Sequence, residues 1–404
     1  MTKGWNKETR NKVILVLASV LLCLYFIEIS LSFLQVKKVR RAASMRKAAQ
    51  GGIPFDKRSV KEFIRDLNND GVEAYPAIWP GSIIRTKGFQ NGLPWQGGTI
   101  LPLAGISRVL TILGNETGQY AVYQSDEHGF NNPYGLFQEK KIDVALIGDS
   151  LTQGCCVSPG EDLGALLRKP GFQVLNLGYG FNGPLLELAT LIEYAKPMRP
   201  RLVLWLYFEG NDLQELSAEA RLSGRLETYF EEDFSQGLIH KQQEINQVLT
   251  EYLQLDSEGN ETNQWSPQGR HSVMRRVLTL SHLRRRLGMG RLLKGPFDKD
   301  LFMGILEKAN SEIHAWGGRL VFVFLPARER FIDGSKRDNF LHRSDVLAMV
   351  NELNIQIIDI AEDFNGHPRP LSLFPFETEP HYNQEGYQIA ARKIEDHLRL
   401  IFLH

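Results

Sequence analysis

Three short segments of this sequence carry residue types that together could attack an ester. Ser150 lies in a GDSL segment, Asn211 in a GND segment and His381 in an EPHYN segment. A serine hydroxyl becomes a nucleophile when a histidine takes its proton, and an amide N–H can stabilise the oxyanion that follows. Because a GDSL or GND segment alone also occurs as a simple turn, the inference depends on the three residues meeting in the fold.

The segments that must position these residues alternate between expected strands and expected helices. Short apolar runs predict strands buried on both faces at residues 142–147, 173–177, 202–208, 320–325 and 355–360. Helical spacing is found at residues 185–194, 305–316, 344–353 and 386–403. This alternation is typical of a parallel sheet, which binds ligands beyond the carboxyl ends of its strands. We therefore expect Ser150, Asn211 and His381 at one edge of a sheet.

In this order the segments resemble the four sequence blocks of the SGNH (GDSL) hydrolase superfamily, which supply Ser, Gly, Asn and His. The resemblance covers about residues 141–404, except an insertion at about 213–303, and implies a flavodoxin-like three-layer α/β fold with a central parallel sheet. It also implies that Ser150 attacks the acyl carbon and that His381 acts as base and then as acid. Residues 125–133 (SDEHGFNNP) resemble a lead-in found in membrane-anchored members associated with exopolysaccharide gene clusters.

The residue that orients the histidine departs from the family's pattern. The family usually has an aspartate two or three residues before the histidine, where this sequence has Glu379 and Thr378. A glutamate holds the imidazole in some other hydrolases. The resemblance therefore implies that Glu379 completes a catalytic group with Ser150 and His381.

The second block departs from the pattern as well. The family presents a glycine N–H to the oxyanion, but the matching position here is Phe181. A turn with positive φ would favour Gly180 or Gly183 instead, and we expect Gly180 to be the donor. The expected oxyanion hole then consists of the backbone N–H groups of Ser150 and Gly180 and the side-chain amide of Asn211.

An apolar segment near the N-terminus is long enough to anchor the chain in a membrane. Residues 13–36 contain one charged residue, Glu28, and as a helix would cross a hydrocarbon core of about 30 Å. The segment is longer than the apolar core of a signal peptide and is followed by basic residues, so we expect a single-pass anchor rather than a cleaved signal or a buried core helix. Basic residues are slightly more numerous after it, which favours a cytoplasmic body, whereas the resemblance favours the periplasmic face of a bacterial inner membrane. The topology stays open.

The rest of the chain divides by composition. We expect an N-terminal tail at residues 1–12, a basic juxtamembrane helical segment at 37–70, an accessory region at 71–140 and the hydrolase domain at 141–404, with an insertion at about 213–303. The insertion is interpreted as a lid or a docking surface. The alternative for its basic stretch is the solvated face of an ordinary helix. Four aromatic residues of the accessory region could stack on sugar rings, although packing in the core is their more ordinary role: Tyr75, Trp79, Phe89 and Trp95.

Neither the charge nor the cysteine content indicates a nucleic acid partner, a disulfide framework or a metal. Lys+Arg and Asp+Glu both number 47, so net charge makes no case for nucleic acid binding. The chain has three cysteines, too few for a disulfide framework, and we expect the adjacent Cys155 and Cys156 to pack as small residues rather than to bridge. Because no Cys/His spacing resembles a zinc site, neither a metal nor an organic cofactor is expected.

These features predict a membrane-anchored serine esterase that removes O-acyl groups, above all O-acetyl groups, from a cell-envelope or extracellular polysaccharide or its lipid-linked precursor. The same residues would support polysaccharide O-acetyl transfer if a sugar hydroxyl replaced water. A lipase or thioesterase acting on lipid acyl chains is a further alternative. A non-catalytic glycan-binding or assembly factor on a degenerate SGNH fold is the last. Nothing in the sequence indicates the oligomeric state.

Overall fold

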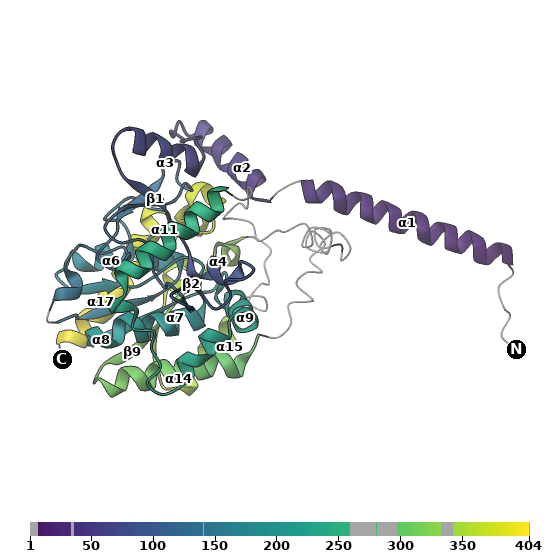
Figure 1. The fold of residues 1–404 in the computed structure, drawn as a ribbon. Coiled ribbons are helices and arrows are strands. Elements are labelled where there is room, and N and C mark those ends of the chain that lie inside the picture. Colours follow the sequence, from purple (N-terminus) through teal and green to yellow (C-terminus); the bar gives the residue numbers. More distant parts are fainter. Residues whose placement is uncertain are drawn as a thin grey trace, which may run out of the picture. The chain divides into compact units, whose positions relative to one another are not determined.

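The computed structural model describes residues 7–33, 36–139, 141–258, 280, 297–332 and 342–403 (Figure 1). By their internal contacts the residues divide into two compact units. One consists of residues 1–42 and 262–296, and the other of residues 43–261 and 297–404. All of the candidate site residues lie in the second unit.

The described part of the first unit is helical. Helix α1 (Lys7–Phe33) contains an 18-residue stretch of mean hydropathy 1.9, Asn11–Glu28, which is long and apolar enough to cross a membrane. The helix begins before the apolar run expected at 13–36 and ends at Phe33, and a second helix, α2 (Val36–Gln50), follows. Length and composition thus agree with the expected anchor, and the side of the membrane stays a prediction.

A parallel sheet of five strands forms the centre of the second unit. Its strands are β6 (Val144–Gly148), β7 (Val174–Asn176), β8 (Leu202–Phe208), β9 (Arg319–Leu325) and β10 (Gln356–Asp359). The order across the sheet is β10-β9-β8-β6-β7, and every neighbouring pair is parallel. Counted along the chain, this is the 2-1-3-4-5 order of flavodoxin-like sheets. The five expected strands and their parallel arrangement are confirmed.

Alternate residues of each strand enter two different cores, which produces three layers. In β6, Val144 and Leu146 pack on one face of the sheet, while Ala145 and Ile147 pack on the other. The first face is covered by α6 (Leu163–Arg168), α16 (Ile360–Asn365) and α17 (Gln384–Leu403). The second is covered by α7 (Pro184–Thr190), α14 (Lys299–Ala315) and α15 (Arg343–Glu352). The apolar runs without polar alternation therefore reflect burial on both faces.

The accessory region adds a second, smaller sheet. Strands β1 (Ala74–Pro76), β4 (Leu110–Gly114) and β5 (Ala121–Gln124) pair in the order β1-β4-β5, and β4 is antiparallel to β5. A separate hairpin joins β2 (Leu93–Trp95) and β3 (Gly98–Ile100), and helix α4 (Pro80–Arg85) completes the region. Helix α3 (Val60–Asn69) precedes it, in the segment expected to be helical at residues 37–70. This region belongs to the same compact unit as the large sheet. The flavodoxin-like description therefore fits the five-stranded sheet but not the whole unit.

The beginning of the expected insertion is packed into the core. It contains α9 (Asp212–Leu222), α10 (Gly224–Glu227) and α11 (Gln242–Glu258), and α11 buries Ile245, Val248 and Leu249. The basic stretch that follows lies, apart from Leu280, outside the described residues, so its role as a lid or docking surface stays a prediction.

The shorter helical elements are α5 (Ser150–Gln153), η1 (Leu136–Gln138), a π-helical turn η2 (Leu191–Ala195), α8 (Lys196–Met198), η3 (Thr228–Phe230), η4 (Leu238–His240), η5 (Arg328–Phe331), η7 (Pro370–Leu373) and η8 (Pro375–Glu377).

Candidate active site

Ser150 lies at the turn between the central strand β6 and the short helix α5. Asp149 caps this helix because its Oδ1 accepts the Leu151 N–H at 3.0 Å. Gly154 ends the helix in the left-handed conformation, with φ 97°. A strand that stops at a cap and a helix that stops after one turn fix the Ser150 side chain beyond the carboxyl end of the sheet, as the apolar run followed by GDSL predicts.

His381 lies in the loop before α17, and its neighbours hold this loop in place. Tyr382 is fully buried, and its hydroxyl donates to a backbone carbonyl just after β9 at 2.8 Å. The Asn383 side chain donates to Ser372 O at 2.7 Å and accepts the Gly386 N–H at 3.1 Å. The His-Tyr-Asn sequence thus joins the imidazole to a buried aromatic anchor and a helix cap.

The structure brings Ser150 and His381 into hydrogen-bond contact although 231 residues separate them. Ser150 Oγ lies 2.9 Å from His381 Nε2 and 3.2 Å from Asp149 Oδ2. Both side chains are only partly buried, so the pair is open to a reactant. A serine and a histidine in this contact can act as nucleophile and base.

The carboxylate on the other side of the imidazole belongs to Glu116. Glu116 Oε2 lies 2.9 Å from His381 Nδ1, across 265 residues of sequence. Glu116 comes from the loop between β4 and β5, in the small accessory sheet. Asn115 shapes this loop by donating to Asp56 O and accepting the Gly118 N–H, each at 2.9 Å. Sequence reasoning missed Glu116 because an acid in a polar turn of a different sheet carries no motif.

The expected position of Glu379 as partner of the histidine is therefore wrong in this structure. The buried Glu379 carboxylate accepts a hydrogen bond from Ser44 Oγ, on α2, and Thr378 Oγ1 lies 2.9 Å from the same hydroxyl. The Glu379 carboxylate is held by the Ser44 hydroxyl of α2, whereas the imidazole Nδ1 is occupied by Glu116. Glu379 is near enough to act on His381 through its charge, but its effect is smaller than that of Glu116.

These charges set the ionisation of the site. Burial lowers the pKa of His381, but the charge of Glu116 and its hydrogen bond, with smaller effects of Asp149 and Glu379, raise it above its ordinary value. Burial raises the pKa of Asp149, against the opposing effect of the Leu151 N–H. The site therefore favours a protonated imidazole, which is the state that forms when a serine gives up its proton.

The loop after β7 packs against the Ser150 turn, but it does not provide the expected donor. Gly178 passes so close to Thr152 that a Cβ would not fit there. The Gly180 N–H donates to Gln153 Oε1 at 2.9 Å, so the fold itself uses it, and the choice of Gly180 for the oxyanion hole is corrected. Gly183 also donates its N–H within the fold, to the buried Glu219. The positive φ of this loop, 60°, belongs to Phe181, at the position that matches the family's glycine.

Asn211 lies at the turn that carries the serine. It is the residue before α9, at the end of the neighbouring strand β8. Its side-chain amide is close enough to Asp149 to lower the pKa of that carboxyl, against the larger effect of burial. The structure thus brings Asn211 next to the residue that precedes Ser150. Two residues earlier, the buried Glu209 pairs with Arg330, which follows β9.

The SDEHGFNNP segment of the accessory region hydrogen-bonds to two elements beside the site, helix α5 and strand β7. Asn131 donates to Gln153 O at 2.9 Å, and Asn132 Oδ1 accepts the Asn176 N–H at 2.8 Å. Asp126 holds the segment by accepting a hydrogen bond from the Asn132 side chain at 2.8 Å. Burial raises the pKa of Asp126 to about 7. The segment therefore supports the helix that begins at Ser150 and the strand next to β6. Its association with exopolysaccharide gene clusters stays a prediction.

Cys155 and Cys156 form a disulfide with each other, which corrects the expectation that they do not bridge. Both follow α5 directly and are largely buried. Sequence alone argued against the bond because adjacent cysteines rarely meet the geometry of ordinary disulfides.

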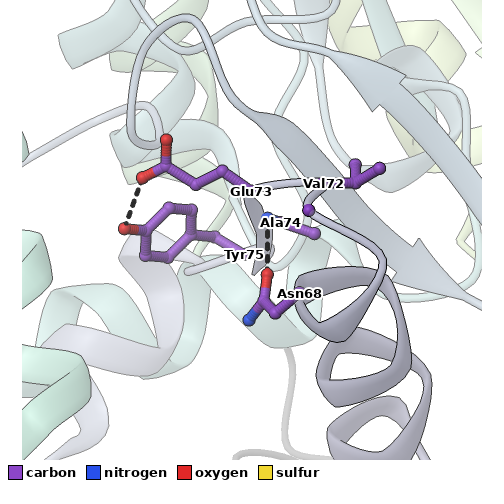
Figure 2. Close-up of a pocket in the computed structure, with 6 residues that line it drawn as sticks. Asn68, Val72, Glu73, Ala74 and Tyr75 are labelled. Carbon is purple, nitrogen blue, oxygen red and sulfur yellow. Dashed lines mark hydrogen bonds between the residues drawn. The ribbon is translucent and has the colours of Figure 1, made fainter.

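The accessory aromatic residues mostly pack in the core. Trp79 is buried with its ring 5.3 Å from that of Phe181, and Phe89 lies 5.8 Å from the ring of Tyr252. Figure 2 shows a pocket between α3 and β1, where Tyr75 donates to Glu73 and Asn68 accepts the Ala74 N–H. None of the candidate site residues lines this pocket.

Comparisons with known proteins find similarity at the level of solved structures. No family model matches the chain, and no curated protein matches it. A G-D-S-L family lipolytic protein from Desulfitobacterium hafniense DCB-2 is 13% identical, with a TM-score of 0.34, over 63% of this chain and 99% of that one. The acetyl xylan esterase AlAXEase is 14% identical, with a TM-score of 0.36, over 63% and 99% of the two chains. A lipase/acylhydrolase from Enterococcus faecalis is 13% identical, with a TM-score of 0.36, over 64% and 96%. The solved structures that this chain is similar to thus include GDSL-type lipolytic proteins and acylhydrolases.

Proposed function

We propose that this chain is an SGNH-type serine esterase that works through an acyl-Ser150 intermediate. The observation that carries the proposal is the unbroken line of hydrogen bonds from Ser150 Oγ through His381 to Glu116, each 2.9 Å long. A hydroxyl, an imidazole and a carboxylate in this order are the parts of a serine hydrolase triad, which is recognised by geometry and not by order in the sequence.

In the first half of the reaction Ser150 Oγ attacks the acyl carbon while His381 Nε2 takes the hydroxyl proton. Glu116 keeps the Nδ1 proton in place, so that Nε2 carries the lone pair, and stabilises the imidazolium that forms. The resulting oxyanion accepts hydrogen bonds from the Ser150 N–H and the Asn211 side chain. Ser150 opens α5, and the first N–H groups of a helix have no acceptor within it. When the C–O bond of the ester breaks, the leaving alcohol takes the proton from His381.

In the second half water replaces the alcohol. His381 takes a proton from water, the hydroxide adds to the acyl carbon, and the bond to Ser150 Oγ breaks as the serine regains its proton. The products are the carboxylic acid and the free enzyme, and atoms and charge balance without a cofactor. The transfer of the acyl group to a sugar hydroxyl would use the same second half, so the acceptor is decided by experiment.

The substrate class that we propose is an O-acetyl ester on a cell-envelope or extracellular polysaccharide or its lipid-linked precursor. An acetyl xylan esterase and a two-domain esterase active on acetylated mannans are among the solved structures similar to this chain, so acetylated glycans are tested first. Helix α1 is proposed to tether the enzyme to the membrane beside such a substrate. Resistance of the full chain to extraction by alkaline carbonate, and its loss when residues 1–35 are removed, would support the tether.

The test of the function is active-site labelling with a fluorophosphonate, followed by measurement of acetate release from acetylated glycans. The full chain in detergent should label at Ser150, as read by mass spectrometry of the modified peptide, and should release acetate. Ser150→Ala should abolish both, while Ser158→Ala, at an exposed serine of the next loop, should leave both unchanged. Absence of labelling in folded wild-type protein, where a control esterase labels, contradicts the proposal. Labelling without release of acetate, together with appearance of the acetyl group on an added glycan acceptor, would indicate transfer.

A further inference from the structure

The disulfide-bonded cysteines lie against the imidazole of the candidate site. A sulfur from Cys155, a sulfur from Cys156 and a ring nitrogen of His381 all lie within 4.8 Å of one another. The three residues come from two distant parts of the chain, the turn after α5 and the loop before α17. No sequence spacing could reveal this cluster, because the histidine is brought to the cysteines only by the fold.

The cysteine pair is fixed to the same turn as the nucleophile. The Cys155 N–H donates to Ser150 O at 2.9 Å. The buried Tyr387 hydroxyl, on α17, lies within hydrogen-bond distance of the carbonyl oxygens of Leu151 and Cys155. The cysteines are therefore held toward His381 by contacts that do not depend on the bond between their sulfurs.

Reduction would change the chemistry of this cluster. A dithiol reductant breaks the S–S bond by delivering two electrons and two protons, and becomes a disulfide itself. The product is two thiols and one imidazole at the same place, and thiolate and imidazole are the ligands that Zn²⁺ prefers. Three protein ligands with water in the fourth position make a complete tetrahedral zinc site, and the thiols lose their protons when the metal binds.

We propose that reduced Cys155 and Cys156 form, together with His381, a site for a thiophilic divalent cation such as Zn²⁺, and that the bound cation inhibits the enzyme. Both nitrogens of His381 are already in hydrogen bonds, Nε2 with Ser150 and Nδ1 with Glu116. A metal that takes either nitrogen removes a contact that catalysis requires. The disulfide form cannot bind the cation in this way, so the cation does not inhibit it. Only the inhibition rests on the proposed function, since metal binding stands on the cluster alone.

The experiment measures zinc binding without reference to activity. The full chain is reduced with a dithiol, freed from it without air, and titrated with Zn²⁺ against a chromophoric chelator. Reduced wild type should hold one Zn²⁺ per chain, and the oxidised protein none. His381→Ala should weaken binding by more than the ~10–100-fold that loss of an outer-shell partner costs. Co²⁺ in place of Zn²⁺ should show a thiolate charge-transfer band that weakens in Cys156→Ser and disappears in Cys155→Ser/Cys156→Ser.

Two further variants separate this inference from the proposed function. Ser150→Ala removes the nucleophile but no ligand, so its reduced form should bind Zn²⁺ as the wild type does. Cys155→Ser/Cys156→Ser should label with fluorophosphonate as the oxidised wild type does, and Zn²⁺ should not slow its labelling. Equal zinc affinity of the reduced, oxidised and double-serine proteins would overturn the inference and leave the esterase untouched. Zinc bound by reduced wild type, with no labelling in any form, would overturn the esterase and the inhibition while the metal site stands.

Discussion

The five-stranded parallel sheet and the three-stranded accessory sheet contribute to the site in different ways. The parallel sheet places Ser150 and Asn211 at the ends of β6 and β8, and α17 beside it carries the loop of His381. The accessory sheet contributes one residue, Glu116, from a hairpin loop. The first group lies where the topology of a parallel sheet requires it. Glu116 reaches the site because of the local path of the loop between β4 and β5. The accessory region therefore completes the site rather than only covering it.

Among the variants that test this difference between the two sheets, Glu116→Gln should lower the catalytic rate most. The amide keeps the size of the side chain but removes the charge that stabilises the imidazolium, and it can leave the wrong imidazole tautomer. We expect the acylation rate to fall by about 10⁴-fold, as kcat does for the corresponding change in a serine protease triad. The rate of fluorophosphonate labelling measures it. A loss below about tenfold, in protein of unchanged thermal stability, would mean that the accessory sheet does not complete the site.

Asn211→Ala tests the contribution of the parallel sheet beyond the nucleophile. Loss of one oxyanion donor costs about 2.7–4 kcal/mol, so kcat should fall by ~10²–10³-fold while KM changes little. Because Asn211 also lies beside the buried Asp149, the melting temperature is measured in parallel. Full activity of Asn211→Ala would remove this residue from the oxyanion hole.

Asn115→Ala tests whether the hairpin loop must be held for Glu116 to act. The variant loses the bonds to Asp56 O and the Gly118 N–H, so the loop should sample positions away from the imidazole. We expect kcat to fall by about tenfold, less than the ~10²-fold that a 1 Å misplacement can cost. Asn68→Ala is the matched control, because it loses a similar hydrogen bond, from the Ala74 N–H, at the end of α3. Equal rates for the two variants would mean that Asn115 does not position Glu116.

The smallest effect should come from Glu379→Gln. The glutamine oxygen can still accept the Ser44 hydroxyl proton, and the imidazole keeps its partner Glu116. We expect kcat to change by less than about threefold, which corresponds to under ~0.7 kcal/mol of barrier. Steady-state rates on a nitrophenyl acetate measure it. A loss as large as that of Glu116→Gln would return Glu379 to the role that the sequence suggested.

The sequence predicted the parts of the molecule that follow from periodic burial. Runs such as LVLWLYF at residues 202–208 are strands because both faces of the sheet are covered, and this pattern is local. The placement of Ser150 and His381 follows from the same reasoning, because each lies at a strand end or just before a helix. Glu116, by contrast, depends on how two sheets pack, which no local pattern encodes. The freedom of glycine to take a positive φ favours Gly180 in the sequence, but Phe181 takes this conformation in the structure.

The pH dependence of acylation tests the central claim, that Glu116 and not Glu379 is the partner of His381, most directly. The pKa of His381 lies above its ordinary value chiefly because the charge and hydrogen bond of Glu116 outweigh burial. A base acts only when neutral, so activity is lost as pH falls through this pKa. The labelling rate is measured against pH for wild type, Glu116→Gln and Glu379→Gln. We predict that the acid limb moves to lower pH in Glu116→Gln, and by clearly less in Glu379→Gln. A larger displacement in Glu379→Gln, or none in Glu116→Gln, would contradict the account.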